Sequence, residues 1–138
     1  MTAHDGAVAK PRPRTSPDSQ PFWDGCRAHR LLLPTCADCD KAHLPPGPVC
    51  PHCFSDRLDW REAKGTGTVT TFVVVHRDWF PAFRADIPYN VVQVELDEGP
   101  RLTASLAGGN EPLSVGLRVR VVFDDVDDRL TLPRFAPA

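Results

Sequence analysis

The chain has 138 residues, of which 41% are hydrophobic and 25% charged, and its formal net charge is −2. That length allows one domain or two small ones, and the sequence has no apolar run long enough to span a membrane. The near-neutral charge points to no particular partner such as nucleic acid. The 15 prolines argue against long helices, because proline lacks an amide donor and clashes inside a helix, so β-strands and loops are expected.

Residues 1–19 are polar and proline-rich, with no periodic apolar pattern. Such a segment buries too little surface to offset its ordering entropy, so we predict a tail that is disordered in the isolated chain. Nothing in it has the apolar centre of a signal peptide. We therefore expect a cytoplasmic protein whose thiols stay reduced.

Residues 19–30 are the one candidate helix in the sequence. Ser19 is placed to cap it, and Phe22, Cys26 and His29 fall on one face. A tryptophan follows Phe22, and this aromatic pair has two interpretations. It packs onto the core, or it docks on another subunit, and the sequence favours neither.

Two C-x2-C pairs follow, Cys36 with Cys39 and Cys50 with Cys53, separated by the ten residues 40–49. Each pair makes a tight turn that aims two thiolates at one point, and the loop is long enough to bring the second turn opposite the first. Four thiolates suit the tetrahedral coordination of a structural Zn²⁺ ion and leave no position open for water. We predict a zinc ribbon with these four cysteines as ligands.

Other uses of these cysteines are less favoured. Iron in a rubredoxin-like site is the chemical alternative, since the same four thiolates accept it. Two disulfides need an oxidising compartment, which the N-terminal sequence does not indicate. Cys26 lies outside the pattern and is interpreted as a packed residue. The nearby histidines, including His43, are not needed as ligands.

We assign the helix and the ribbon to residues 20–64 and a β-barrel to residues 65–138, with Gly65-Thr66-Gly67 as a hinge between them. A ribbon of this size is too small to hold itself together. Metal binding worth on the order of 10 kcal/mol makes up the shortfall.

Five β-strands are expected in the second part, over residues 68–76, 89–97, 101–106, 117–124 and 129–135. The first is a β-branched run typical of a well-buried strand, and several of the others alternate apolar and polar residues. The expected core includes Val92, Val94, Leu96, Val119, Val121 and Phe123. Five strands at this spacing favour a small OB-fold barrel. The fold class is therefore mainly β: an N-terminal helix, a four-cysteine zinc ribbon and a five-stranded OB-fold barrel.

The one long irregular connection, residues 76–88, carries three aromatic rings and two arginines: Arg77, Trp79, Phe80, Phe83 and Arg84. Aromatic residues beside arginines are typical of a contact surface. The alternative is that the rings plug the open end of the barrel. His76 and Asp78 lie close together, which is weak evidence for acid–base catalysis.

These motifs together resemble one family. They are the Phe-Trp helix, the two C-x2-C pairs around a Pro-Pro loop, the G-x-G segment, the stretch PYNVVQVELDEGPRLTASLAG and the closing LPRF. The family is the rubredoxin-like zinc ribbon plus OB-fold known as domain of unknown function 35, whose members are associated with acyl-CoA. The resemblance covers roughly residues 20–137. It implies a thiolase-like or lipid-transfer-type thiolase partner in acyl-CoA chemistry, including steroid side-chain degradation.

The chain departs from this family at two positions. Members often have glycine directly after each C-x2-C, where positive φ relaxes the turn. Here Asp40 and Phe54 occupy those positions. Aspartate tolerates positive φ moderately and phenylalanine poorly.

The leading interpretation is a non-catalytic accessory subunit that binds a thiolase-fold enzyme and helps to bind or channel an acyl-CoA. We expect the loop residues named above to contact the CoA, and no catalytic residue on this chain. A nucleic-acid-binding zinc-ribbon/OB protein is the alternative. Acidic residues outnumber basic ones between Glu95 and Asp128, which argues against it. A third possibility is an iron-bearing electron carrier.

Overall fold

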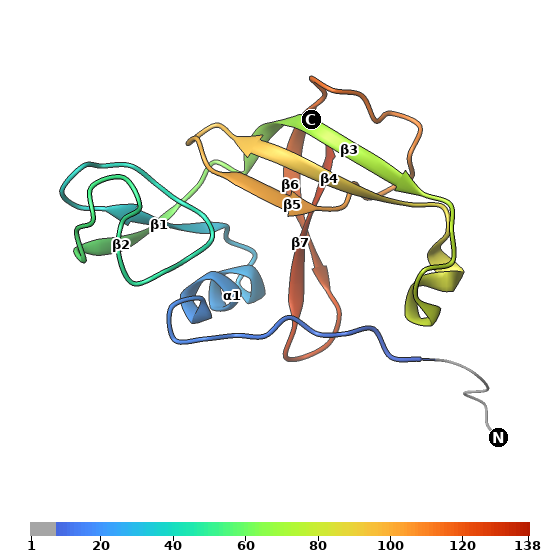
Figure 1. Cartoon of the computed structure of the whole chain (residues 1–138), viewed down its shortest axis with the longest axis horizontal. Coiled ribbons are helices and arrows are strands. Elements are labelled where there is room, and N and C mark those ends of the chain that lie inside the picture. Colours follow the sequence, from blue (N-terminus) through green and yellow to red (C-terminus); the bar gives the residue numbers. More distant parts are fainter. Residues whose placement is uncertain (1–7) are drawn as a thin grey trace.

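The computed structural model describes residues 8–138. Its elements in chain order are α1 (Gln20–Arg27), β1 (Leu32–Cys36), β2 (Leu58–Glu62), β3 (Thr66–Val75), the 3-10 helix η1 (Pro81–Asp86), β4 (Tyr89–Leu96), β5 (Arg101–Ala104), β6 (Arg118–Asp125) and β7 (Thr131–Pro137) (Figure 1). The strands form a two-stranded sheet and a curled five-stranded sheet. The mainly β fold class, with its N-terminal helix, four-cysteine ribbon and OB-fold, is confirmed.

The helix α1 ends earlier than the sequence predicts. The amide of Arg30 donates to the carbonyl of Gly25, and the amide of His29 donates to that of Cys26. His29 has φ of 59°. This is a Schellman cap, which ends a helix with one residue in the left-handed conformation. His29 is therefore turned off the helical face on which it was expected and lies exposed.

The expected side-chain cap at the start of α1 is wrong. Ser19 makes no side-chain hydrogen bond to the first turn. Its hydroxyl accepts a hydrogen bond from the amide of Ser16 instead. The Ser19 hydroxyl is thus used in a local turn before the helix, because serine side chains often hydrogen-bond to nearby backbone groups in turns.

The ribbon is built on the antiparallel pair β1–β2, in register from Leu32 opposite Glu62 to Cys36 opposite Leu58. β1 enters the first metal turn directly and is buried over most of its length. The buried residues of α1, the ribbon and the barrel form one continuous cluster. The ribbon therefore packs on the barrel without a separate core.

The five-stranded sheet has the order β5-β4-β3-β6-β7. A register shift between Val69 and Thr71 marks a bulge in β3, which lets a strand bend. The two ends of the sheet meet at Phe135 of β7. Its amide donates to the carbonyl of Ser105, and its carbonyl accepts from the amide of Ala107. This short parallel contact closes the sheet into a barrel.

The outer half of β3 is not the well-buried strand that its β-branched sequence predicts. β3 pairs with β4 along nearly its whole length but with β6 only at Thr66, Gly67 and Thr68. Beyond Val69 it pairs with β4 alone, and beyond Phe72, where the pairing of β4 with β5 ends, β3 and β4 continue as a two-stranded hairpin that leaves the barrel and carries η1 (Figure 1). With no third strand beside it, this part of β3 keeps one edge and much of its surface in solvent, and Val73 is exposed.

Most of the predicted barrel core is confirmed, because Val92, Val94, Leu96 and Val119 are fully buried. Val121 and Phe123 are only half-buried, which corrects that part of the prediction. β6 pairs with β3 only as far as Arg120, so its second half has β7 as its one partner strand in the described part of the chain. The ring of Phe123 stacks on His29, 5.2 Å between centroids.

The glycines expected to form a hinge are closely packed. Gly67 lies inside β3, where an added Cβ would come within 2.5 Å of the Glu95 carbonyl oxygen. Gly65 has φ of +83°, and an added Cβ there would meet Val121 at 2.7 Å. Both positions need glycine because the neighbouring strand is too close for a side chain.

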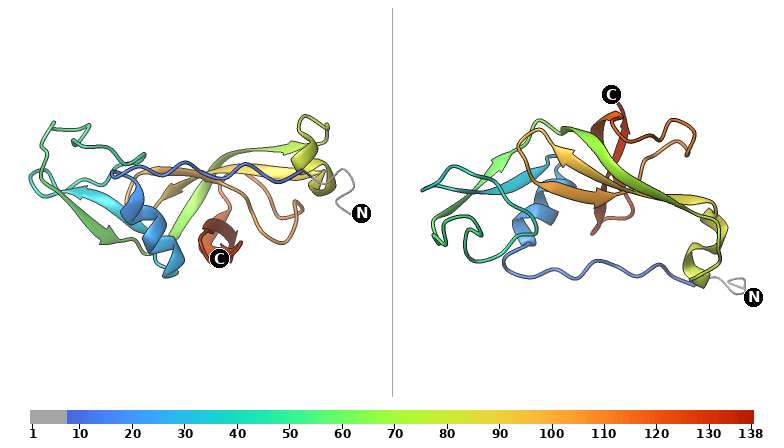
Figure 2. Two further views of the ribbon diagram at one scale, coloured as in Figure 1. Left: turned by 90° about the horizontal axis from the view of Figure 1, so that it is seen from below. Right: turned by 45° about the horizontal axis from the view of Figure 1, so that its top comes forward.

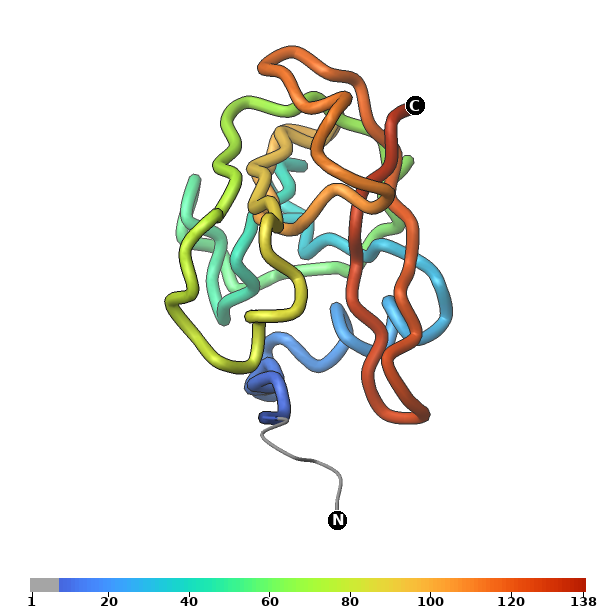
Figure 3. The backbone as a smooth tube through the Cα atoms, turned by 90° about the vertical axis from the view of Figure 1, so that its right-hand side faces the viewer, coloured from blue at the N-terminus to red at the C-terminus, as the bar shows by residue number. Residues whose placement is uncertain are grey.

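Residues 8–15 form an extended strap that runs along one side of the molecule, from η1 toward α1 (Figure 2, right). Figure 3 views this strap nearly end-on. Lys10 pairs with Asp86 of η1 at 2.6 Å, and Arg12 pairs with Asp127, after β6, through two bonds of 2.8 and 3.1 Å. The predicted disordered tail falls partly on residues 1–7, which lie outside the described residues, and it stays a prediction. Within residues 8–138 no helix is long and apolar enough to cross a membrane.

Candidate metal centre and hairpin-tip surface

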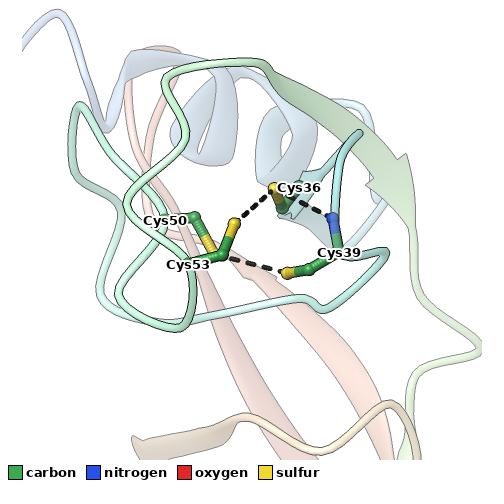
Figure 4. A group of neighbouring side chains, drawn as sticks. All are labelled: Cys36, Cys39, Cys50 and Cys53. Carbon is green, nitrogen blue, oxygen red and sulfur yellow. Dashed lines mark hydrogen bonds between the residues drawn. The ribbon is translucent and has the colours of Figure 1, made fainter.

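The four cysteines of the two C-x2-C pairs converge on one point (Figure 4). Cys36 ends β1, and Cys39 closes the turn that follows it. Cys50 and Cys53 come from the opposite turn. The Sγ atoms of Cys36 and Cys53 are 3.5 Å apart, those of Cys39 and Cys50 are 3.6 Å apart, and all four lie within 4.8 Å of one another.

This geometry fits a metal ion. A Zn–S distance of about 2.3 Å in a regular tetrahedron places the sulfur atoms about 3.8 Å apart. The Sγ separations found here bracket that value, so one ion at the centre would reach all four sulfur atoms. No ligand position would remain open, so such an ion would have a structural role.

Backbone amides favour the thiolate form of Cys36. The amides of Cys39 and Asp38 donate to its Sγ at 3.4 and 3.3 Å. These bonds lower the pKa of the Cys36 thiol to about 6. The second turn repeats the pattern, since the amide of His52 donates to Sγ of Cys50 at 3.4 Å. Metal binding requires deprotonated sulfur, and the amide bonds favour that form at Cys36.

The residue after each C-x2-C has the left-handed conformation. Asp40 has φ of 65° and Phe54 has φ of 64°. Each amide donates to the carbonyl of the first cysteine of its turn, Cys36 or Cys50, at 2.8 Å. Both turns therefore have the left-handed geometry that suits glycine, although aspartate and phenylalanine occupy the positions where the resemblance led us to expect glycine.

Neither Cys26 nor His43 belongs to the metal site. Cys26 is fully buried in the core, and burial raises the pKa of its thiol to about 12, so it stays protonated. His43 lies in the loop between the cysteine pairs and is 5% exposed. Neither of its ring nitrogens has a hydrogen-bond partner among residues 8–138, which is uncommon for a buried polar group.

The tip of the β3–β4 hairpin forms an exposed aromatic surface. Trp79 and Phe80 are each 61% exposed. The guanidinium of Arg77 lies 4.8 Å from the centroid of the Trp79 ring, a cation–π contact. These rings stand in solvent at the end of the hairpin, so they do not plug the barrel.

The other two residues expected at this surface have different surroundings. Arg84 pairs with Asp78 at 2.6 Å, which offsets its charge. Phe83 is half-buried and packs against Tyr89, 5.7 Å between centroids, with the ammonium of Lys10 5.4 Å from its ring. No bound ligand tests the predicted CoA contacts, and they stay a prediction.

A cavity beneath the strap was not predicted from the sequence. Its lining includes Phe22 and Trp23 of α1, Leu102 and Ala104 of β5, and Leu132 of β7. Phe22 is buried in the core and Trp23 is half-buried beside it, with the two rings in edge-to-face contact, 5.2 Å between centroids. Only the alternation of apolar and polar residues along β5 could have suggested that its apolar face borders a cavity.

Comparison with known proteins agrees with this architecture. Residues 23–59 match the model described as "ChsH2, rubredoxin-like zinc ribbon domain", and residues 60–124 match "ChsH2, C-terminal OB-fold domain". A solved structure described as "Ltp2-ChsH2(DUF35) aldolase" has a chain that is 39% identical, with a TM-score of 0.82. The match covers 91% of this chain and 98% of that one.

Two curated relatives carry different names. A Thermomonospora curvata protein, "Probable enoyl-CoA hydratase alpha subunit", is 40% identical over 100% of this chain, which spans 43% of that protein's length. A Methanocaldococcus jannaschii "DUF35 domain-containing scaffold protein" is 32% identical over 71% of this chain and 73% of that protein.

The fold and the cysteine site define a rubredoxin-like ribbon joined to an OB-fold. The chain belongs to the DUF35 family of zinc-ribbon and OB-fold proteins.

Proposed function

We propose that the protein is a non-catalytic accessory subunit that binds a thiolase-fold enzyme and helps it to bind or channel an acyl-CoA. One observation carries the proposal: the likeness to the chain of the Ltp2-ChsH2(DUF35) aldolase, which extends over nearly all of that chain. The scaffold name of the archaeal relative also supports a role in an assembly.

The metal in this proposal is Zn²⁺ with a structural role. The donor set of four thiolates supports zinc and also accepts iron. Elemental analysis of the purified protein separates the two, and a stoichiometric iron content would contradict zinc. Cys50→Ala should abolish metal binding and unfold the ribbon, whereas Cys26→Ala should keep the metal and cost about 1 kcal/mol.

The hairpin tip is the surface that we assign to the partner and its CoA. Trp79 and Phe80 are larger apolar groups than a monomer usually leaves on a projecting element, and tryptophan is enriched among residues that dominate interfaces. Arg77 beside them could pair with a CoA phosphate. Since Asp78 offsets the charge of Arg84, we expect Arg77 to contribute more than Arg84.

Co-expression with a thiolase-fold protein encoded nearby, followed by gel filtration, tests this assignment. We expect a hetero-oligomer, with Trp79→Ala weakening it about tenfold or more because a central aromatic contact is lost. Val115→Ala is the matched control, since Val115 is also highly exposed but lies outside the hairpin. Metal content should be unchanged in both variants. A protein that stays monomeric beside a thiolase that is fully active alone would contradict the proposal.

A second candidate is a subunit of a hydratase. The 40% identity to a protein named as an enoyl-CoA hydratase alpha subunit favours it, although that protein is more than twice as long as the matched region. The same co-expression experiment separates the two. Co-purification with a hydratase-fold protein, and none with a thiolase-fold protein, would favour the second candidate.

A further inference from the structure

The strap is attached at its C-terminal end to the turn that precedes α1. The carbonyl of Ser16 accepts hydrogen bonds from the amides of Ser19 and Gln20, at 3.1 and 2.8 Å. The amide of Ser16 in turn donates to the Ser19 hydroxyl at 2.9 Å. The helix that follows is held in the core by Phe22 and Cys26, which are both buried. One end of the strap is therefore fixed to the body of the molecule.

Arg12 fixes the middle of the strap to the turn between β6 and β7. Its two guanidinium nitrogens donate to the two carboxylate oxygens of Asp127, at 2.8 and 3.1 Å. Such a bidentate pair fixes direction as well as distance. The same carboxylate accepts the amides of Arg129 and Leu130, so it is itself held in place by the turn. The bond from Arg12, with that from the Arg129 amide, lowers the pKa of Asp127 to about 2, so the pair stays charged at neutral pH.

The N-terminal end of the strap contacts η1. The ammonium of Lys10 lies 2.6 Å from a carboxylate oxygen of Asp86 and 5.4 Å from the centroid of the Phe83 ring. One side chain thus makes both an ion pair and a cation–π contact with the same short helix. Pro11 and Pro13 restrict the backbone of the strap. The strap therefore reaches η1 as a stiff arm, since proline-rich segments act as semi-rigid spacers.

The β3–β4 hairpin is supported at its base but not at its tip, residues 76–87. At the base, the side chain of Asn110 accepts a hydrogen bond from Asn90 and donates to the carbonyl of Pro88. In the part of the chain that the structure describes, the hydrogen bonds, ion pairs and ring contacts of the tip either stay within the hairpin or reach Lys10. A two-stranded hairpin is marginally stable on its own, so its pairing alone does not fix the direction of the tip.

We propose that the strap is a brace that holds the hairpin tip at a fixed angle to the barrel. It is supported by the turn before α1, by Asp127 and by η1, and the contacts of Lys10 complete the connection. Exposed ion pairs each add little stability and are screened by salt, so the brace is releasable. The inference goes beyond the proposed function, because it concerns how Trp79 and Phe80 are oriented, whatever they bind.

NMR relaxation of the isolated full chain tests the brace. In Lys10→Ala, the amide order parameters of the tip should fall from about 0.85, typical of a rigid backbone, to about 0.6 or below, while those of the barrel stay unchanged. Arg14→Ala is the matched control and should leave the tip ordered. It removes a positive charge from the same strap, at an exposed residue that has no ion pair in the described part of the chain.

Residual dipolar couplings extend this test to slower motions. One alignment tensor should describe both the tip and the barrel in the parent, whereas the couplings of the tip should be reduced in Lys10→Ala. Equal order parameters and equal tip couplings in the parent and Lys10→Ala would contradict the proposal.

Salt and a charge swap test whether the ion pair holds the tip. At about 1 M NaCl, where the Debye length is about 3 Å, the tip of the parent should approach the mobility seen in Lys10→Ala. Lys10→Glu should release the tip, and adding Asp86→Lys should restore part of its order because the pair forms again with its charges exchanged. A tip that stays rigid at high salt would overturn the proposal. So would a double variant as mobile as Lys10→Glu alone.

Discussion

Phe54 has a backbone conformation that suits glycine, and its side chain is too exposed to offset the cost by packing. Its φ is 64°, and the side chain is 79% exposed. The left-handed conformation costs an L-residue roughly 1–2 kcal/mol. The second cysteine turn is therefore formed against a local backbone preference, which the hydrogen bond from the Phe54 amide to the Cys50 carbonyl opposes and a bound metal ion would oppose further.

Phe54→Gly should stabilise the metal-loaded protein by about 1 kcal/mol, because glycine reaches positive φ without steric cost. Urea unfolding with metal present measures the change. Phe54→Ala is the control and should give no such gain, since alanine keeps a Cβ. Asp40→Gly should gain less, because aspartate tolerates this conformation and its ion pair with Arg61 would be lost. Equal stability of Phe54→Gly and Phe54→Ala would contradict the explanation.

His43 should make the ribbon sensitive to acid. Burial, with a smaller contribution from His52, lowers the pKa of His43 below its usual 6.5. The folded state therefore holds His43 neutral, while the unfolded chain protonates it near 6.5. This group's contribution to stability is complete above that pH and is lost as pH falls through the lowered folded pKa.

Unfolding followed between about pH 7.5 and pH 5 tests this expectation. His43→Leu should lose less stability across the range than the parent, because the titrating group is gone. Metal content is measured in parallel, since protons also compete for the cysteine thiolates. Parallel stability profiles of parent and variant, with metal retained in both, would show that His43 is not responsible.

Within α1, Gly25 looks like a weak point in the sequence but is required by the fold. An added Cβ would lie 2.8 Å from the Arg30 carbonyl oxygen and 2.8 Å from Cγ of Leu32. The chain reverses directly over this glycine as it passes from the helix into β1. Helix propensity therefore predicts that Gly25→Ala stabilises the protein, whereas packing predicts that it destabilises the protein.

Gly25→Ala should destabilise the protein by about 1–3 kcal/mol, because the steric cost exceeds the gain in helix propensity of about 1 kcal/mol. Asp24→Ala, at the exposed neighbouring position, should be close to neutral. Thermal or urea unfolding of both variants measures the difference. A Gly25→Ala protein more stable than the parent would mean that propensity dominates at this position.

The convergence of the four cysteines and the sequence of strands along the chain were predictable because their signals are local. Cysteine spacing alone indicates the site, and alternation in the stretch around Val92 and Val94 gives the buried face of β4. The exposure of Val73 was not predictable, because a β-branched run reports strand propensity and says nothing of how many neighbours the strand has. The cavity depends on where α1 and the strap settle over β5, which no single segment encodes.

At the scale of the whole molecule, the surface gives little support to nucleic-acid binding. Several barrel arginines are paired with carboxylates: Arg101 with Glu95, Arg118 with Asp97, and Arg134 with Asp124. Phosphate binding needs clustered cations that remain available. The net charge of −2 adds a weak general repulsion.

Single-stranded DNA should therefore bind weakly, with Kd above about 10 µM at physiological salt. Fluorescence anisotropy with a labelled oligonucleotide at two salt concentrations measures this. Submicromolar affinity that falls steeply with salt would favour the nucleic-acid-binding interpretation over the accessory subunit.

The closure of the barrel through Phe135 has a consequence for the order of events during synthesis. The helix α1 packs against both β1 and β7. Its packing therefore cannot be completed until β7, the last strand to be synthesised, is available. The ribosome releases the four cysteines well before β7, and the ribbon can therefore load its metal while the barrel is still open. A chain truncated before Thr131 would keep both metal turns, but the second half of β6 would lack its partner strand β7 and α1 would lack its contacts with β7. Chaperones and proteases recognise such open edges, so metal loading alone does not protect an incomplete chain.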